Sequence, residues 1–200
     1  MSQPSRIKQL DERTIGHIAA GEVVERPAQV VKELIENSID ADSSRITIEI
    51  ERGGFDLIRI TDDGSGIHEH DLSLSLDRHA TSKLSSEEDL AAIGTLGFRG
   101  EALASIGMVS KLSISSRPLG TEGRKIVMDN GNKGKIEPAG VAEGTSIEVS
   151  HIFANQPARL AFQRRPATET SKIVDVVVSH AISHPEVGFR LVSDEKTILE

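Results

Sequence analysis

The clearest hydrophobic pattern in the chain lies in residues 27–41, PAQVVKELIENSIDA. At 100° per residue, Val30, Leu34 and Ile35 lie on one broad apolar arc, and the polar side chains occupy the remaining sector. This pattern predicts an amphipathic helix with Pro27 in its first turn. The polar sector holds Gln29, Glu33, Glu36, Asn37 and Asp40.

This polar sector has two interpretations. Carboxylates on the outside of an amphipathic helix usually form a solvated face. Within the helix, however, only Lys32 balances their charge. A face with carboxylates, a carboxamide and so few basic side chains could also contact an anionic ligand that carries a metal ion.

The rest of the chain predicts an α+β fold. Two strands separated by Gly53 and Gly54 form a plausible hairpin, and most other strands have a strand neighbour in the chain. We therefore expect a two-layer sandwich, in which helices cover one side of a mixed, largely antiparallel sheet, rather than a parallel doubly wound fold. The expected strands are 45–51, 56–61, 111–117, 124–129, 145–153 and 188–193. The other expected helices are 11–24 with a break at Gly21, 69–76, 101–109, 158–165 and 168–184.

One domain is expected over residues 1–200, with a lid region at about 77–100. The last residues, DEKTILE, resemble the first strand of a hairpin. We therefore expect the chain to stop at or just into the start of a second domain.

The composition is typical of a globular protein, with 37% hydrophobic and 27% charged residues among 200. The absence of cysteine excludes disulfides, thiolate metal sites and cysteine nucleophiles, and fits a reducing compartment. No apolar run approaches the ~20 residues of a membrane span. These features predict a cytoplasmic protein without a membrane partner.

Charge is distributed unevenly. Residues 1–100 carry 11 basic and 19 acidic side chains, whereas residues 101–200 carry 12 of each. The acidic first half argues against a general nucleic-acid surface there. The basic residues Arg159, Arg164 and Arg165 either contact DNA or form an ordinary cationic helix end.

The stretch TDDGSGI, residues 61–67, ends a predicted strand with two acids and two glycines. Asp and Gly are common in turns for local backbone reasons. Alternatively, Gly64 and Gly66 let a flat ligand approach the backbone. Asp62 would then accept a hydrogen bond from an exocyclic amine, as adenine carries.

Two further stretches suggest phosphate chemistry. In GTLGFRGEAL, residues 94–103, glycines precede a helix whose first backbone amides could bind an anion. An ordinary loop that leads into a helix would have the same sequence pattern. No Lys follows the glycines as in a P-loop, and the G-x-G-x-x-G pattern is absent. RHATSKL, residues 78–84, is either a solvated loop or a lid over phosphates. The seven histidines have no HExxH spacing, the pair His68 and His70 fits the surface better than a metal site, and no Ser-His-Asp order stands out.

Together these motifs resemble the N-terminal ATPase domain of the MutL family of DNA mismatch repair proteins. This family belongs to the GHKL group, with gyrase, the ninety-kilodalton heat-shock chaperones and histidine kinases. The resemblance covers nearly the whole chain. It rests on IAAGEVVERPAQVVKELIENSIDA, RHATSK, LGFRGEALASI and FANQPAR, in the family's order.

The resemblance implies a Mg²⁺-dependent ATPase on the GHKL (Bergerat) fold. It makes Glu33 the general base for the attacking water and Asn37 a ligand of Mg²⁺ bound to ATP. It implies that Asp62 recognises adenine by accepting a hydrogen bond from its amine, with Thr145 beside the base. The full set implied to bind the nucleotide is Asn37, Asp62, Gly64, Gly66, Thr81, Ser82, Lys83, Gly97, Phe98, Arg99, Gly100, Glu101, Ala102, Leu103 and Thr145.

The resemblance also implies partners. These are a MutS-like mismatch-recognition protein, a downstream nuclease or helicase, DNA bound weakly and without sequence preference by the full protein, and a second copy of the chain on ATP binding. The family's second domain supplies a lysine to the γ-phosphate, and charge stabilisation there is a large share of catalysis. We therefore expect this chain alone to bind Mg-ATP but to hydrolyse ATP poorly.

Some residues depart from the family pattern. Asp63 stands where Asn is usual and adds negative charge near the expected pocket, which would weaken nucleotide binding. Asp42 and Ser43 replace the usual Gly-Ala, and Ala154 and Gln156 stand where Tyr and Thr are common. Two alternatives remain, namely another GHKL machine and a nucleotide-gated interaction module without significant turnover.

Overall fold

The computed structural model describes residues 8–83, 96–97 and 100–200. Phe98 and Arg99 of the predicted site lie outside the described residues. No helix in the described part of the chain is long and apolar enough to cross a membrane.

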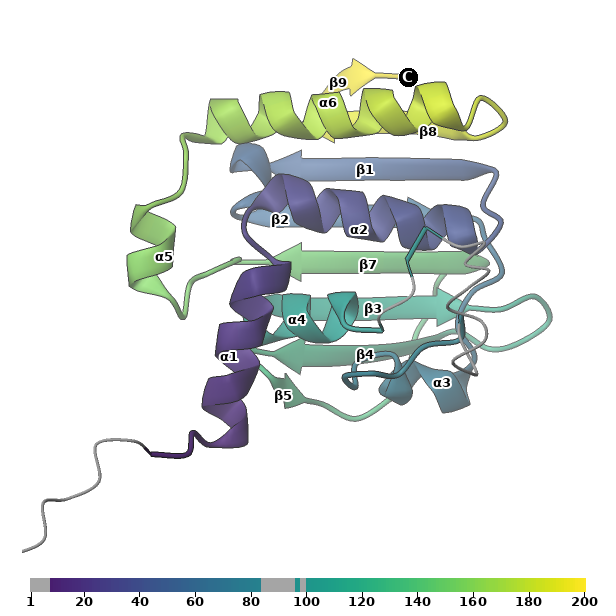
Figure 1. The fold of residues 1–200 in the computed structure, drawn as a ribbon. Coiled ribbons are helices and arrows are strands. Elements are labelled where there is room, and N and C mark those ends of the chain that lie inside the picture. The colour runs from purple at the N-terminus through teal and green to yellow at the C-terminus, as the bar shows by residue number, and fades with distance from the viewer. Residues whose placement is uncertain (1–7, 84–95, 98–99) are drawn as a thin grey trace, which may run out of the picture.

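A nine-stranded mixed sheet forms one layer of the fold (Figure 1). Its strand order is β5-β4-β3-β7-β2-β1-β8-β9, and β6 pairs with β4. Only β1 and β8 pair in parallel, while all other neighbours are antiparallel. The strands are β1 (Arg45–Glu51), β2 (Leu57–Asp62), β3 (Lys111–Arg117), β4 (Arg124–Asp129), β5 (Asn132–Lys133), β6 (Glu137–Pro138), β7 (Gly144–Ser150), β8 (Gly188–Ser193) and β9 (Lys196–Leu199).

The helices form the second layer, over one face of the sheet (Figure 1). α2 lies over β1 and β2, α6 over β8, and α4 over β3 and β4, while α1 packs on α4. The predicted α+β sandwich is therefore confirmed. The helices are α1 (Glu12–Val23), α2 (Pro27–Asp40), α3 (Glu69–Leu74), α4 (Ala102–Met108), α5 (Pro157–Ala161) and α6 (Pro166–Ser183), with a 3₁₀ turn η1 at Arg52–Gly54.

The core is aliphatic and lies between the two layers. Inward residues alternate with outward ones along the strands, as a sheet with one covered face requires. Ile48, Ile58 and Ile114 are fully buried there, in one cluster with the apolar residues of α2.

Helix α2 has the boundaries that its sequence favours. Pro27 occupies the first turn, where its missing N–H costs nothing. Its four central apolar residues, Val30, Val31, Leu34 and Ile35, are at most 1% exposed. The helix ends where Asp42 adopts a left-handed backbone (φ 57°) and donates its N–H to Ile39 O.

Several predicted elements have different limits in the structure, and three of these differences have a clear cause. α1 continues through Gly21 to Val23, because packing on α4 outweighs the ~1 kcal/mol that glycine costs a helix. β7 ends at Ser150, since the backbone turns left-handed at His151 and Phe153. α5 ends at Ala161, and Pro166 holds the residue before it in an extended conformation.

The end of the chain also differs from the expectation. Lys196–Leu199 form the second strand of the β8–β9 hairpin rather than the first strand of a new one. Asp194 and Glu195, both with positive φ, make the turn without the glycine that usually marks it. The domain boundary itself stays a prediction.

Candidate functional site

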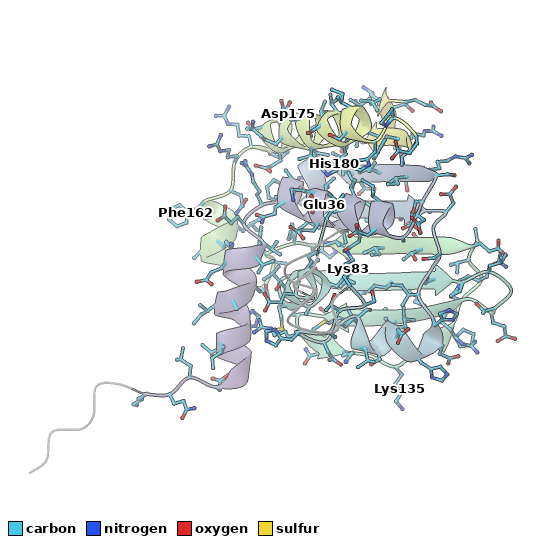
Figure 2. The ribbon with its side chains drawn as sticks, turned by 45° about the vertical axis from the view of Figure 1, so that its right-hand side comes forward. Glu36, Lys83, Lys135, Phe162, Asp175 and His180 are labelled. Atoms are coloured by element: carbon cyan, nitrogen blue, oxygen red, sulfur yellow. The ribbon has the colours of Figure 1, made fainter. Side chains whose placement is uncertain are left out.

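The polar sector of α2 faces two different neighbours. Glu36 is 8% exposed and lies on the α6 side, where Lys32 Nζ is 2.7 Å and His180 Nε2 is 3.7 Å from Oε1 (Figure 2). Glu33 and Asn37 are half-buried one helical turn apart. The packing of α6 therefore removes Glu36 from the set that can face a ligand.

Asn37 and Asp40 are balanced by a cation from outside the helix. Lys83 Nζ donates to Asn37 Oδ1 at 2.9 Å and to Asp40 Oδ2 at 2.5 Å. The side chains of Lys83 and Asp40 are 18% and 8% exposed. An ion pair that is so well covered is not part of a solvated surface. The interpretation of the polar sector of α2 as a solvated face is therefore wrong at Asn37 and Asp40.

Asp62 lies at the end of β2, between the sheet and α2, and it is 8% exposed. Its Oδ2 accepts a hydrogen bond from Ser38 Oγ at 2.9 Å. Its Oδ1 accepts from Gly64 N at 3.0 Å and from Thr145 N at 3.2 Å. Three donors from α2, the turn after β2 and β7 thus hold one carboxylate in a single orientation.

Burial raises the pKa of Asp62 above its ordinary value. The hydrogen bonds from Gly64, Ser38 and Thr145 favour the carboxylate and limit this rise. A buried carboxylate that still accepts hydrogen bonds is a strong acceptor for an amine donor.

The two glycines after Asp62 are required by the protein itself. A Cβ on Gly64 would lie 2.6 Å from Ala41 O and from Ser43 Oγ. Gly66 has φ 74°, and a Cβ there would lie 2.9 Å from Pro118 N. Close packing of this turn on the end of α2 and on the end of β3 therefore explains both glycines without a ligand.

Thr145 is brought beside Asp62 by the sheet. The two residues are register partners in the antiparallel β2–β7 pair. Thr145 Oγ1 lies 2.9 Å from Ser116 Oγ, which also donates to Gly144 O and accepts from Ile67 N. Ser116 thus supports both the threonine and the glycine turn.

Ser38 and Ser116 were missed by sequence reasoning. Each is a polar residue at a buried position of an otherwise regular apolar pattern. Such a buried hydroxyl needs a partner, and this requirement was the available signal. The partner itself is visible only in three dimensions.

Gly100, Glu101, Ala102 and Leu103 of the predicted phosphate site lie at the N-terminal end of α4. Gly100 has φ 61°, and a Cβ there would lie 2.5 Å from Ala80 O. Thr81 Oγ1 accepts from Lys83 N at 3.1 Å, and Ser82 is exposed. Glu101 is at the N-cap position of α4 but makes no side-chain capping bond, and its Oε1 lies 3.1 Å from His79 Nδ1, while Ala102 and Leu103 form the first turn.

The Asp63 carboxylate accepts its hydrogen bonds at the start of β1, and its expected effect on nucleotide binding stays a prediction. It accepts from Ser44 N and Oγ and from Arg45 N, at 2.7 to 2.8 Å. Desolvation opposes ionisation, but these hydrogen bonds dominate and lower the pKa of Asp63. Asp63 therefore anchors the start of β1.

Arg159 of the basic stretch has a structural role. Its Nη2 donates to Gly21 O at 2.5 Å, and its guanidinium lies 4.9 Å from the centre of the Phe153 ring. This side chain links α5 to α1.

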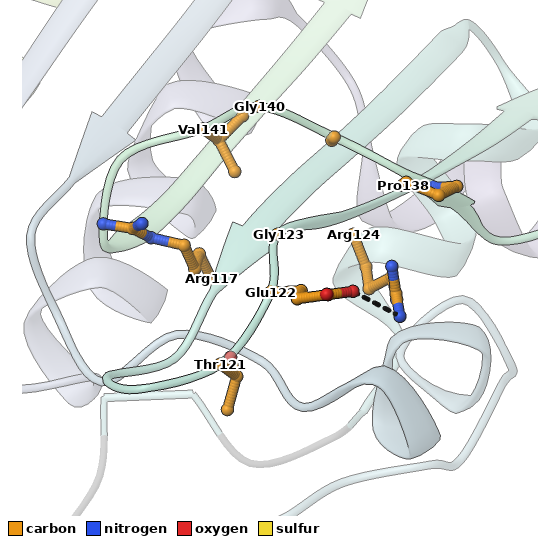
Figure 3. A pocket seen from close by; sticks show the side chains of 9 residues that line it. Arg117, Thr121, Glu122, Gly123, Arg124, Pro138, Gly140 and Val141 are labelled. Carbon is orange, nitrogen blue, oxygen red and sulfur yellow. Dashed lines mark ion pairs between the residues drawn. The ribbon is translucent and has the colours of Figure 1, made fainter.

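An open hollow of about 650 Å³ lies beside the β3–β4 turn (Figure 3). Arg117 and Arg124 line it, but Arg124 pairs with Glu69 and Glu122, and Arg117 lies 3.6 Å from Glu143. Because both guanidinium groups already face carboxylates, this hollow is a poor anion site.

The residues at Asn37 fit a phosphate-bound Mg²⁺ better than a protein-enclosed metal. Among the described residues no group of three His, Cys, Asp or Glu side chains could hold a metal ion. Mg²⁺ in nucleotide sites takes one or two protein oxygens and completes its shell with phosphates and water. The amide oxygen of Asn37, which accepts from the Lys83 ammonium, is such an oxygen.

Comparison with known proteins identifies the family of this chain. The family profile described as "Histidine kinase-, DNA gyrase B-, and HSP90-like ATPase" matches residues 25–150. The DNA mismatch repair protein MutL of Thermoanaerobacter sp. (strain X514) is 53% identical over 193 residues, which are 96% of this chain and 31% of that protein. The protein of the same name from Geobacter sulfurreducens is 49% identical, over 98% of this chain and 32% of that protein.

A solved structure shows the same fold. The Aquifex aeolicus MutL ATPase domain complexed with ADP has a TM-score of 0.72 and 34% identity, over 88% of this chain and 63% of that one. The chain spans about a third of the length of the two MutL relatives. It belongs to the family of histidine kinase-, DNA gyrase B- and HSP90-like ATPases and, within that family, to the MutL group.

Proposed function

We propose that this chain binds ATP with Mg²⁺ and hydrolyses ATP slowly, as the ATPase domain of a mismatch repair protein. The observation that carries the proposal is the buried Asp62 carboxylate, which is oriented by Ser38, Gly64 and Thr145. A MutL ATPase domain similar to this chain has been solved with ADP.

Asp62 would recognise the base of the nucleotide. Its carboxylate would accept a hydrogen bond from the exocyclic amine of adenine, and Thr145 is its neighbour in the β2–β7 pair. Guanine carries a carbonyl oxygen in the corresponding position. That oxygen would face the carboxylate without a shared proton, so ATP should be favoured over GTP.

Asn37 and the loop residues would hold the phosphates. Mg²⁺ bound to Asn37 Oδ1 and to the phosphates would neutralise their charge and orient them. Lys83, Thr81 and Ser82 supply an ammonium and two hydroxyls. The remaining residues proposed for the phosphates are Gly97, Phe98, Arg99, Gly100, Glu101, Ala102 and Leu103.

Glu33 would act as the general base. It lies one turn before Asn37, so the two side chains leave α2 on the same side. Its carboxylate would accept a proton from the attacking water.

In the whole protein, the proposal extends to the family's partners. ATP would bring two copies of the domain together, and the assembly would link a MutS-like mismatch-recognition protein to a nuclease or helicase and to DNA. These roles rest on the similarity to MutL proteins.

The first test is ATP binding by calorimetry, with Asp62→Asn as the variant. Loss of a hydrogen bond to a charged group should weaken ATP binding by roughly 10- to 100-fold. Asp63→Asn is the matched control, because the Asp63 carboxylate accepts its hydrogen bonds at the start of β1, and this variant should bind ATP at least as tightly as the unaltered chain. Failure of the unaltered chain to bind ATP, or equal binding of GTP, would refute the proposal.

The affinity should also depend on pH through Asp62. Because burial raises the pKa of this carboxyl, it takes up a proton at a higher pH than an ordinary Asp. The protonated carboxyl is a poorer acceptor for the adenine amine, so affinity should fall as the pH is lowered from 7 through this raised pKa. Adenosine, titrated by calorimetry at several pH values, avoids phosphate protonation. A flat profile down to the pH at which an ordinary Asp titrates would contradict the assignment.

A further inference from the structure

Asp40, near the end of α2, holds two chain segments that are distant in sequence. Its Oδ2 accepts from Lys83 Nζ at 2.5 Å and from Gly97 N at 3.3 Å, and its Oδ1 accepts from Leu96 N at 3.0 Å. The same ammonium donates to Asn37 Oδ1 at 2.9 Å. A single carboxylate thus keeps a lysine on the amide oxygen that the proposed function gives to Mg²⁺.

The surroundings are shaped for an ammonium at this point. The Lys83 and Asp40 side chains are both largely covered. A Cβ on Gly97 would lie only 3.2 Å from Lys83 Nζ and 3.8 Å from Asn37 Oδ1. Glycine at position 97 therefore leaves the room that the ammonium fills.

The ammonium and a divalent cation cannot share this oxygen at low cost. Mg²⁺ binds oxygen at about 2.1 Å, so the two cations would stand within about 5 Å of each other. Like charges at that separation repel strongly in a poorly solvated site. The flexible stem of lysine allows the ammonium to leave Asn37 when a metal arrives.

We propose that Asp40 is a positioning residue that keeps the Lys83 ammonium on Asn37 in the metal-free site, so that Lys83 and the divalent cation compete for one oxygen. This inference rests on the proposed function, in which Asn37 binds the metal. Asp40 then determines how firmly the Lys83 ammonium is held on Asn37 Oδ1, and so how much of its binding free energy the metal spends in displacing it. It does not attract the metal.

Calorimetry can measure this competition as a ratio. The dissociation constant of ATP is determined with a chelator and again with Mg²⁺, and their ratio gives the gain in affinity that the metal provides. Asp40→Asn keeps the size of the side chain but removes its charge, so the ammonium is held less firmly. The ratio should rise by roughly fivefold.

The opposite sign is expected if Asp40 helps the metal directly, because loss of a nearby negative charge then weakens metal binding. An unchanged or smaller ratio in Asp40→Asn therefore overturns the inference. Asp42→Asn is the matched control, since Asp42 is exposed and its left-handed backbone suits Asn. It removes the same charge two residues away and should leave the ratio unchanged.

Lys83→Met gives a second, independent reading. It removes the ammonium itself, so the ratio should again rise, even where metal-free ATP binds more weakly. A lower ratio in this variant also contradicts the competition. If the unaltered chain binds no ATP, the proposed function fails. If the unaltered chain binds ATP normally but the ratio does not rise in Asp40→Asn and Lys83→Met, this inference alone fails.

Discussion

Replacing Glu33 with Ala should reduce ATP hydrolysis by about 10²- to 10⁴-fold while ATP binding stays near that of the unaltered chain. This range is what a positioned general base typically contributes. Glu33 is half-buried on α2, one turn before Asn37, and its loss leaves the Asp62 carboxylate, which we propose binds adenine, in place. Release of radiolabelled phosphate from ATP is sensitive enough for the slow turnover expected here.

Glu33→Asp is the control for position. It keeps the carboxylate but withdraws it by one methylene, so an intermediate rate is expected. Equal rates in Glu33→Ala and the unaltered chain would remove Glu33 from the reaction. No measurable release by the unaltered chain, despite ATP binding, would instead favour the nucleotide-gated interaction module.

Replacing Arg26 with Ala should lower the free energy of unfolding by about 3–5 kcal/mol. Arg26 precedes the first turn of α2 and makes a two-point ion pair with Glu169 in the first turn of α6, at 2.5 and 3.2 Å. Glu169 is fully buried, so its carboxylate would lose its ion-pair partner where water cannot replace it. Urea unfolding, followed by far-UV circular dichroism, measures the change.

Two comparisons separate the buried pair from general damage. Lys172→Ala removes an exposed pair with Asp175 in the same helix and should cost no more than about 1 kcal/mol. The double change Arg26→Met with Glu169→Leu removes both charges and should recover most of the loss. A similar small effect in Arg26→Ala and Lys172→Ala would show that burial does not control this pair.

Local patterns account for what could be predicted. The apolar arc of α2, the alternation along β1 and β3 and the turn at Gly64 are each encoded within a few residues, and their limits agree closely with the structure. The α+β class followed from these elements. The MutL resemblance supplied the proposed role of Glu33, which periodicity alone left open.

Strand pairing could not be predicted in the same way. β7 inserts between β2 and β3, and β8 pairs in parallel with β1. These neighbours are far apart in sequence, and no local pattern specifies which edges meet. This pairing alone brings Thr145 to Asp62.

The sequence by itself determined the helices, most strands and the residue types available for nucleotide chemistry, because propensity and periodicity act over one or two turns. Only the tertiary structure decided which of these residues share a site. It turned Glu36 toward α6, set Asp63 against the start of β1 and brought Lys83 onto Asn37 and Asp40. The physical reason is that burial and charge pairing depend on neighbours from distant parts of the chain.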